Sequence, residues 1–171
     1  WSWVMDQNTY GLLNIVLRFF GFGPLRWFNS SSTAMLSVVI VSVWKSIGYY
    51  AIVILSALKA IPADIYEAAA LDNAPKVRTF FKITLPMLSP QLFFLLIVIT
   101  INSFKVFDTI RIMTEGGPGS STDVLTYYIY RYAFRHFRIG YASAAGTVLM
   151  VILMVMTAVY FKVLSKRVHY Q

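Results

Sequence analysis

The sequence contains no cysteine and few acidic residues, with 7 Asp and Glu against 15 Lys and Arg in 171 residues. Without cysteine, a disulfide framework and a thiolate metal site are both excluded. The histidines, His136 and His169, have no carboxylate or cysteine partner at metal-binding spacing, so no metal site is expected. Charged residues make up 13% of the chain, about half the share usual in a soluble domain. The composition therefore points away from a soluble domain.

Apolar residues dominate the chain and gather in long runs. Hydrophobic residues make up 58% of the sequence. Residues 35–58, 87–104 and 142–161 each approach or exceed the roughly 20 residues that a helix needs to cross a bilayer. Lys45 is the only charged residue inside these runs. The pattern predicts an all-α membrane protein with these runs as transmembrane helices.

The remaining segments are expected outside the hydrocarbon layer. Residues 1–34 contain GLLNIVLRFFGFG, which is too short to span and suits an interfacial helix. Residues 105–141 hold the turn-rich TEGGPGSSTD and an aromatic run that is typical of an interfacial aromatic belt. Residues 59–86 form a loop between two spans, and residues 162–171 form a tail.

The net charge of +8 favours the lipid bilayer over nucleic acid as a partner, because most Lys and Arg residues flank the apolar runs and anchor at headgroups there.

Three spans place residues 59–86 and the tail on one side of the membrane and the other segments on the opposite side. One side carries Lys59, Lys76, Arg78, Lys82, Lys162, Lys166 and Arg167, and the other Arg18, Arg26, Lys105, Arg111, Arg131, Arg135 and Arg138. These numbers are equal, so the positive-inside rule does not decide the orientation.

The loop at residues 59–86 has helix signals on both sides of a turn. Pro62 suits the first position of a helix, and PADIYEAAALD predicts a helix that runs to Asp72, too short to cross the membrane. Asn73 tolerates the left-handed conformation, and Pro75 disfavours helix at the residue before it. A second helix, PKVRTFF, is expected after this turn.

Two interpretations of the first loop helix remain open. It is either a solvated connection with high helix propensity or a docking element for another protein. Ala68, Ala69 and Ala70 have small side chains that let another surface approach the helix backbone, and Glu67 and Asp72 flank them with charge. On the second interpretation, the alanines are the contact surface and the carboxylates orient it.

The same loop carries the signature of a transport family. Glu67, Ala68 and Ala69, then Asn73, then ITLP at residues 83–86 resemble the pattern E-A-A, three residues, G, nine residues, I-x-L-P of membrane subunits of ATP-binding-cassette (ABC) importers. The one departure is Asn73 in the glycine position. The resemblance implies that the loop is cytoplasmic and that its helix docks in a cleft of an ATPase subunit. The coupling residues it implies are Glu67, Ala68, Ala69, Asp72 and Asn73.

A second set of motifs narrows the resemblance. The stretch IMTEGGPGSSTDVLTYYIYRYAFRHFRIGYASA, with YGLLN and KAIPADIYEAA, is similar to carbohydrate-uptake permeases related to the maltose-transporter membrane subunits. That family implies a bundle of about six helices, so this chain, which begins with Trp1 and shows no signal-peptide order, is expected to be the C-terminal part. It also implies a second permease subunit, two ATPase subunits that use ATP and magnesium, an external solute-binding protein, and the prokaryotic inner membrane.

Polar residues inside the spans are candidates for a solute path. Lys45 is costly in a membrane, at roughly 2.5–3.5 kcal/mol on insertion scales, and is expected to face protein or water. Tyr49 lies one turn further along, and Asn102 and Ser103 lie near the end of the second span. Aromatic rings, amides and hydroxyls are the groups that recognise sugars. The alternative is that these residues make interhelical hydrogen bonds or, for Lys45, reach a membrane surface.

Other functions fit the sequence less well. An intramembrane enzyme needs a nucleophile–base pair or a metal cluster within the spans, and both histidines lie outside them. A proton-coupled transporter needs buried carboxylates, which the spans lack. No Walker-type glycine loop is present, so ATP hydrolysis is expected in a partner. A permease for a non-sugar solute such as a glycerol phosphate, or a channel or structural subunit without ATP coupling, remains the alternative.

Overall fold

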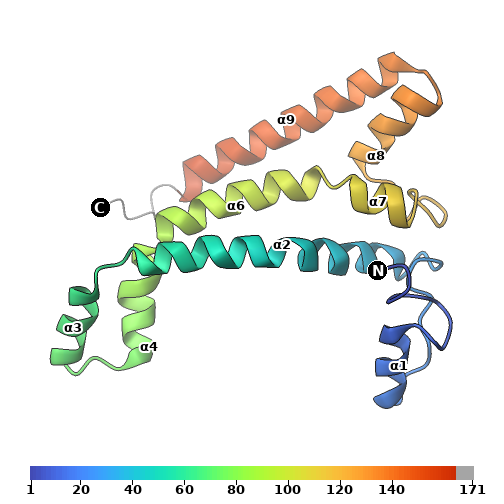
Figure 1. Cartoon of the computed structure of the whole chain (residues 1–171). Helices are drawn as coiled ribbons and strands as arrows, with labels where there is room; N and C mark the ends of the chain where they lie inside the picture. Colours follow the sequence, from blue (N-terminus) through green and yellow to red (C-terminus); the bar gives the residue numbers. More distant parts are fainter. Residues whose placement is uncertain (165–171) are drawn as a thin grey trace. The chain divides into compact units, whose positions relative to one another are not determined.

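The computed structural model describes residues 1–164, which are helical without a strand among them (Figure 1). The elements are α1 (Leu12–Phe19), α2 (Ala34–Lys59), α3 (Ala63–Leu71), α4 (Lys76–Thr79), the π-helix η1 (Phe80–Thr84), α5 (Leu85–Met87), α6 (Ser89–Phe104), α7 (Asp108–Met113), α8 (Leu125–Tyr130), the π-helix η2 (Arg131–Arg135) and α9 (Ile139–Leu164). Most of the tail expected at residues 162–171, including His169, lies outside the described residues.

Three helices are long and apolar enough to cross a membrane. They begin at Ala34, Ser89 and Ile139. Only 11%, 17% and 6% of the residues in their most apolar windows are buried within the chain, so most of their apolar surface is left for lipid or for other helices. The prediction of an all-α membrane chain with three spans is confirmed.

The first compact unit comprises residues 1–46 and 103–151. Met5, Trp27 and Val41 form one buried cluster. Beside it, the buried amide of Asn14 donates to the carbonyls of three loop residues and accepts a 3.0 Å bond from Trp27 Nε1. Asn14 thus fixes the segment around α1, a role that sequence analysis did not assign.

A second cluster in the same unit corrects one expectation for the aromatic run. Tyr127 has no exposed surface and packs with Val38 and Ile110. It is therefore a core residue and not part of an interfacial belt. Sequence analysis missed this burial because the residues that pack against Tyr127 come from α2 and α7, which are separate segments of the sequence.

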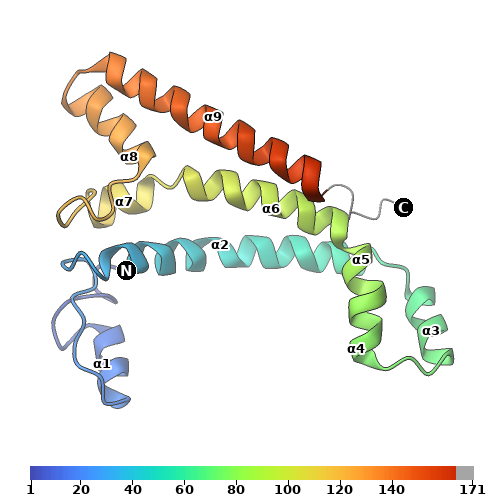
Figure 2. The same ribbon diagram turned by 180° about the vertical axis from the view of Figure 1, so that it is seen from behind.

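The second unit comprises residues 47–102 and the described residues from 152 onward. Figure 2 shows α3 and α4 side by side, with α4 leading through α5 toward α6. The second loop helix was predicted to end at Phe81, but helical backbone continues through η1 and α5 to Met87. Pro86 has no N–H to give the carbonyl of Lys82, and the wider π-turn lies immediately before it.

Candidate functional site

The loop helix α3 is shorter than predicted at both ends. Pro62 has φ −58° and ψ 138°, so it caps the helix in an extended conformation and does not form its first turn. Asp72, with ψ 8°, lies just past the last helical residue, Leu71. Asp64 lies in the first turn, where the partial positive charge of the helix terminus favours a carboxylate.

The turn after α3 is a Schellman motif built on Asn73. Asn73 has φ +50°, and its N–H donates to the carbonyl of Ala70 at 3.0 Å. The N–H of Ala74 donates to the carbonyl of Ala69, also at 3.0 Å. These bonds satisfy two of the carbonyls left free at the helix end. The prediction that Asn73 keeps the turn in the position of the signature glycine is confirmed.

This geometry predicts how the turn responds to substitution. We expect Asn73→Gly to leave the loop folded, whereas Asn73→Val should destabilise it by about 1–2 kcal/mol, because a β-branched residue is strained in the left-handed region. The rate at which a protease cuts the loop in membrane vesicles measures the change. Equal cutting of the two variants would contradict this account of the turn.

The faces of α3 differ from the sequence interpretation. Three consecutive alanines cannot share one face, because each residue turns the helix by about 100°. Ala69 is only 7% exposed and points toward α4, whereas Ala68 is exposed. Ala69 therefore does not share an exposed surface with Ala68, whereas Ala70 is exposed like Ala68.

The outward face of α3 combines charge with one large apolar side chain. Asp64, Glu67, Ala68 and Leu71 are exposed on it, and helical spacing places them together. Leu71 is 83% exposed. Sequence analysis missed Leu71, although its spacing of three from Ala68 and four from Glu67 was the signal that could have found it. We call these four residues the outward face of α3.

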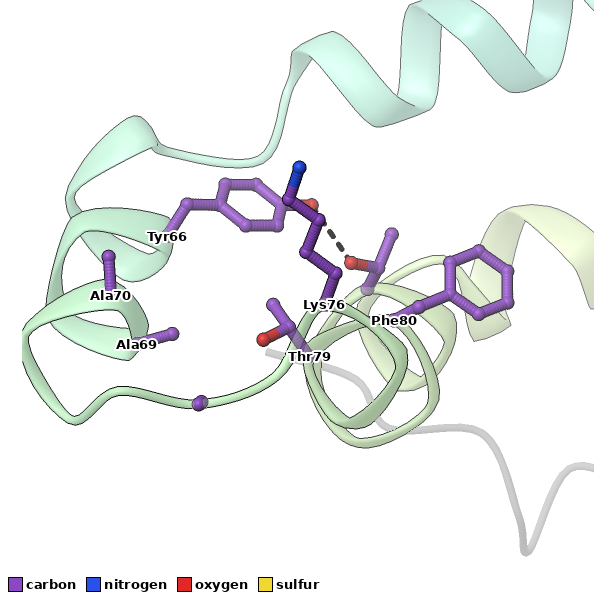
Figure 3. Close-up of a pocket in the computed structure, with 8 residues that line it drawn as sticks. Tyr66, Ala69, Ala70, Lys76, Thr79 and Phe80 are labelled. Carbon is purple, nitrogen blue, oxygen red and sulfur yellow. Dashed lines mark hydrogen bonds between the residues drawn. The ribbon is translucent and has the colours of Figure 1, made fainter.

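The inward face of α3 borders a cavity of about 370 Å³ against α4 and η1. Its lining is Tyr66, Ala69, Ala70, Ala74, Lys76, Thr79, Phe80 and Thr84. Figure 3 shows the Tyr66 ring reaching from α3 across this space. The hydroxyls of Tyr66 and Thr84 lie 3.2 Å apart and form a hydrogen bond.

The candidate solute-path residues fall in different units. Lys45 and Ser103 belong to the first unit, and Tyr49 and Asn102 to the second. All four are exposed within the chain. In the second unit, Asn102 Nδ2 donates to the Tyr50 hydroxyl at 3.3 Å. The Tyr50 ring packs edge-on to Tyr49 at 5.3 Å between centroids, so the described contacts link Tyr49 and Asn102 through Tyr50, a residue that sequence analysis did not single out.

The loop between α7 and α8 holds a cluster of ion pairs. Glu115 contacts Arg111 at 2.9 Å and Arg135 at 3.0 Å. The hydrogen bond from Arg135, with the positive charges of both arginines, lowers the pKa of the Glu115 carboxyl. Among residues 1–164 no group of three or more His, Asp or Glu side chains is placed to hold a metal ion. The cluster ties α7 to η2.

Fold and loop together define a component of a membrane transport system. Residues 9–170 match the family of binding-protein-dependent transport system inner membrane components, and the chain belongs to this family. The resemblance drawn from the EAA signature is confirmed, and the family is one of transport components, not of enzymes.

Relatives and solved structures agree with this assignment. The chain is 41% identical over 158 residues to the sulfoquinovosyl glycerol transport system permease protein SmoG of Agrobacterium fabrum, covering 92% of this chain and 51% of that protein. It is 37% identical over 163 residues to the trehalose/maltose transport system permease protein MalF of Thermococcus litoralis, covering 95% and 55%. Other relatives are sn-glycerol-3-phosphate permeases.

A solved structure extends the likeness to three dimensions. A chain of a bacterial alginate ABC transporter, in complex with an alginate pentasaccharide-bound periplasmic protein, superposes with a TM-score of 0.83 at 25% identity. The match covers 95% of this chain and 57% of that chain. The chain thus spans about half the length of the proteins that it matches.

Proposed function

We propose that the chain is part of the permease subunit of a binding-protein-dependent ABC importer, that it forms half of the path for a sugar or oligosaccharide, and that it couples to ATPase subunits through α3. The observation that carries the coupling is the outward face of α3. It presents Glu67, Ala68 and Leu71 to solvent on a short helix that a Schellman turn ends sharply. Among the residues described, none packs on that face closely enough to bury it.

The outward face has the make-up of a docking surface. An exposed leucine supplies apolar contact area, Ala68 lets a partner approach the backbone, and Asp64 and Glu67 supply charge at the rim. Interfaces of this kind draw most of their energy from a few central apolar anchors, with charges setting orientation. The support lies in the combination, because one exposed leucine alone is ordinary on a protein surface. These features favour docking over the alternative of a passive loop.

The proposed setting follows from the family. The loop at residues 59–86 and the tail are cytoplasmic, residues 1–34 and 105–141 are extracytoplasmic or interfacial, and the complex lies in a prokaryotic inner membrane. The partners are a second permease subunit, two ATPase subunits with ATP and magnesium, and an extracytoplasmic solute-binding protein. The structural relative in complex with a periplasmic protein supports that last partner.

A sugar is the proposed solute, since relatives named for sulfoquinovosyl glycerol, trehalose and maltose, and alginate point to glycosides. The proposed path residues are Lys45, Tyr49, Asn102 and Ser103, to which the structure adds Tyr50 as the contact of Asn102. The relatives that carry sn-glycerol-3-phosphate favour a phosphorylated polyol as the second candidate. Uptake assays with purified binding protein and each solute class separate the two.

Replacement of Glu67 tests coupling directly. We expect Glu67→Ala to weaken assembly with the ATPase, or the coupling of transport to hydrolysis, by about 10- to 100-fold, the size of a lost charge-assisted hydrogen bond. Co-purification with the ATPase and solute-stimulated ATP hydrolysis in vesicles are the measurements. Glu67→Gln keeps the shape of the side chain and some of its hydrogen bonding. Its ATPase association and stimulated hydrolysis should lie between those of the wild type and those of Glu67→Ala. Wild-type transport and hydrolysis in Glu67→Ala would reject the role of Glu67.

A further inference from the structure

The attachment of α3 to the rest of the second unit is indirect. Irregular backbone flanks the helix on both sides, at residues 60–62 and 72–75. Helix continuity therefore does not set the angle of α3. Its inward face, with Tyr66 and Ala69, borders the cavity toward α4 and η1, and the hydrogen bond from Tyr66 to Thr84 crosses to η1.

Apolar packing alone does not fix that angle. The inward face borders a cavity of about 370 Å³, so α3 is not closely packed along its length. Apolar contact is also non-directional, so it does not by itself select one orientation of the helix. A directional contact is needed to hold one orientation.

The hydrogen bond between the Tyr66 hydroxyl and Thr84 Oγ1 is directional. Its 3.2 Å length joins residues 18 apart in the sequence, and Thr84 is 7% exposed. Thr84 ends η1, directly before α5 and the span α6. The bond therefore ties the docking helix to the backbone that enters the membrane, across the cavity that Figure 3 shows.

We infer that the Tyr66–Thr84 hydrogen bond is the joint that sets the angle of α3 on the helix leading into α6, so that movement of a docked ATPase reaches the span through it. Tyr66 and Thr84 are positioning residues on this account, and neither forms the docking contact itself. The inference rests on the proposed function, because it concerns transmission between a docked ATPase and the membrane.

The test uses the complete importer in vesicles, with the ratio of solute-stimulated to basal ATP hydrolysis as the readout. Tyr66→Phe should leave ATPase co-purification at the wild-type level while the ratio falls about 2- to 10-fold, the size of one hydrogen bond in a coupling equilibrium. Thr84→Val should give the same loss, and the double variant should lose no more than either single one. Thr84→Ser keeps the hydroxyl and should retain the wild-type ratio.

A second phenol–threonine pair of the same unit is the matched control. Tyr160 and Thr100 are also hydrogen-bonded at 3.2 Å but do not involve α3, so Tyr160→Phe should leave the ratio unchanged. A wild-type ratio in Tyr66→Phe, an equal loss in Tyr160→Phe, or lost co-purification in Tyr66→Phe would each overturn the inference alone. Absence of ATPase association in the wild type would overturn the proposed function and the inference with it.

Discussion

Ala68→Trp is expected to abolish solute-stimulated ATP hydrolysis while membrane insertion stays intact. Ala68 is exposed on the outward face of α3, so an indole there would extend from a part of the helix that the described chain leaves uncovered. It would instead fill the space that a docking partner needs at the helix backbone. Bulk at the core of an interface excludes the partner, so the effect is expected to be large if α3 docks through this face. Expression in membranes, ATPase co-purification and stimulated hydrolysis measure it.

Two variants sharpen this experiment. Ala68→Ser keeps the side chain small and should hydrolyse ATP like the wild type. Ala69→Trp places the same bulk on the inward face, where Ala69 is only 7% exposed and borders the cavity. It should leave the outward face free and retain more stimulated hydrolysis than Ala68→Trp. Persistent stimulated hydrolysis in Ala68→Trp would show that α3 does not dock through this face. A passive connecting loop would then be the better description.

Lys45→Met is expected to lower uptake by about tenfold or more, or to change solute preference, while insertion and assembly stay normal. Lys45 lies near the middle of α2 and is exposed within the chain. A charge at that depth is costly unless it faces water or protein. A lysine that lines an aqueous path donates hydrogen bonds to hydroxyl-rich or anionic solutes. Methionine keeps the length of the side chain and removes that charge.

The alternative for Lys45 is a structural ion pair with a carboxylate elsewhere in the bundle. Lys45→Arg keeps the charge and should preserve uptake on either account. Lys59→Met removes a lysine from the last turn of the same helix and should leave solute preference unchanged. Loss of assembly in Lys45→Met, with unchanged preference in the protein that remains, would make the lysine structural and remove it from the proposed path.

The sequence by itself determined the features that depend on short stretches of chain. The three spans follow from runs of apolar residues, since a helix in lipid satisfies its own backbone. The turn at Asn73 follows from one residue that tolerates positive φ next to an Ala-Pro pair. The EAA signature, read at fixed spacing, identified the family without any tertiary information.

Only the tertiary structure decided which side chains are covered. Ala68 and Ala69 are adjacent and identical, yet Ala69 is buried and Ala68 exposed, because Ala69 is on the side of α3 that borders α4 and η1. Tyr127 was expected in an interfacial aromatic belt but lies in the core, because residues of α2 and α7 pack against it. The Tyr66–Thr84 bond joins residues 18 apart, and no local pattern encodes such a contact. Burial and long-range hydrogen bonds depend on how segments distant in sequence pack, which periodicity within one segment cannot specify.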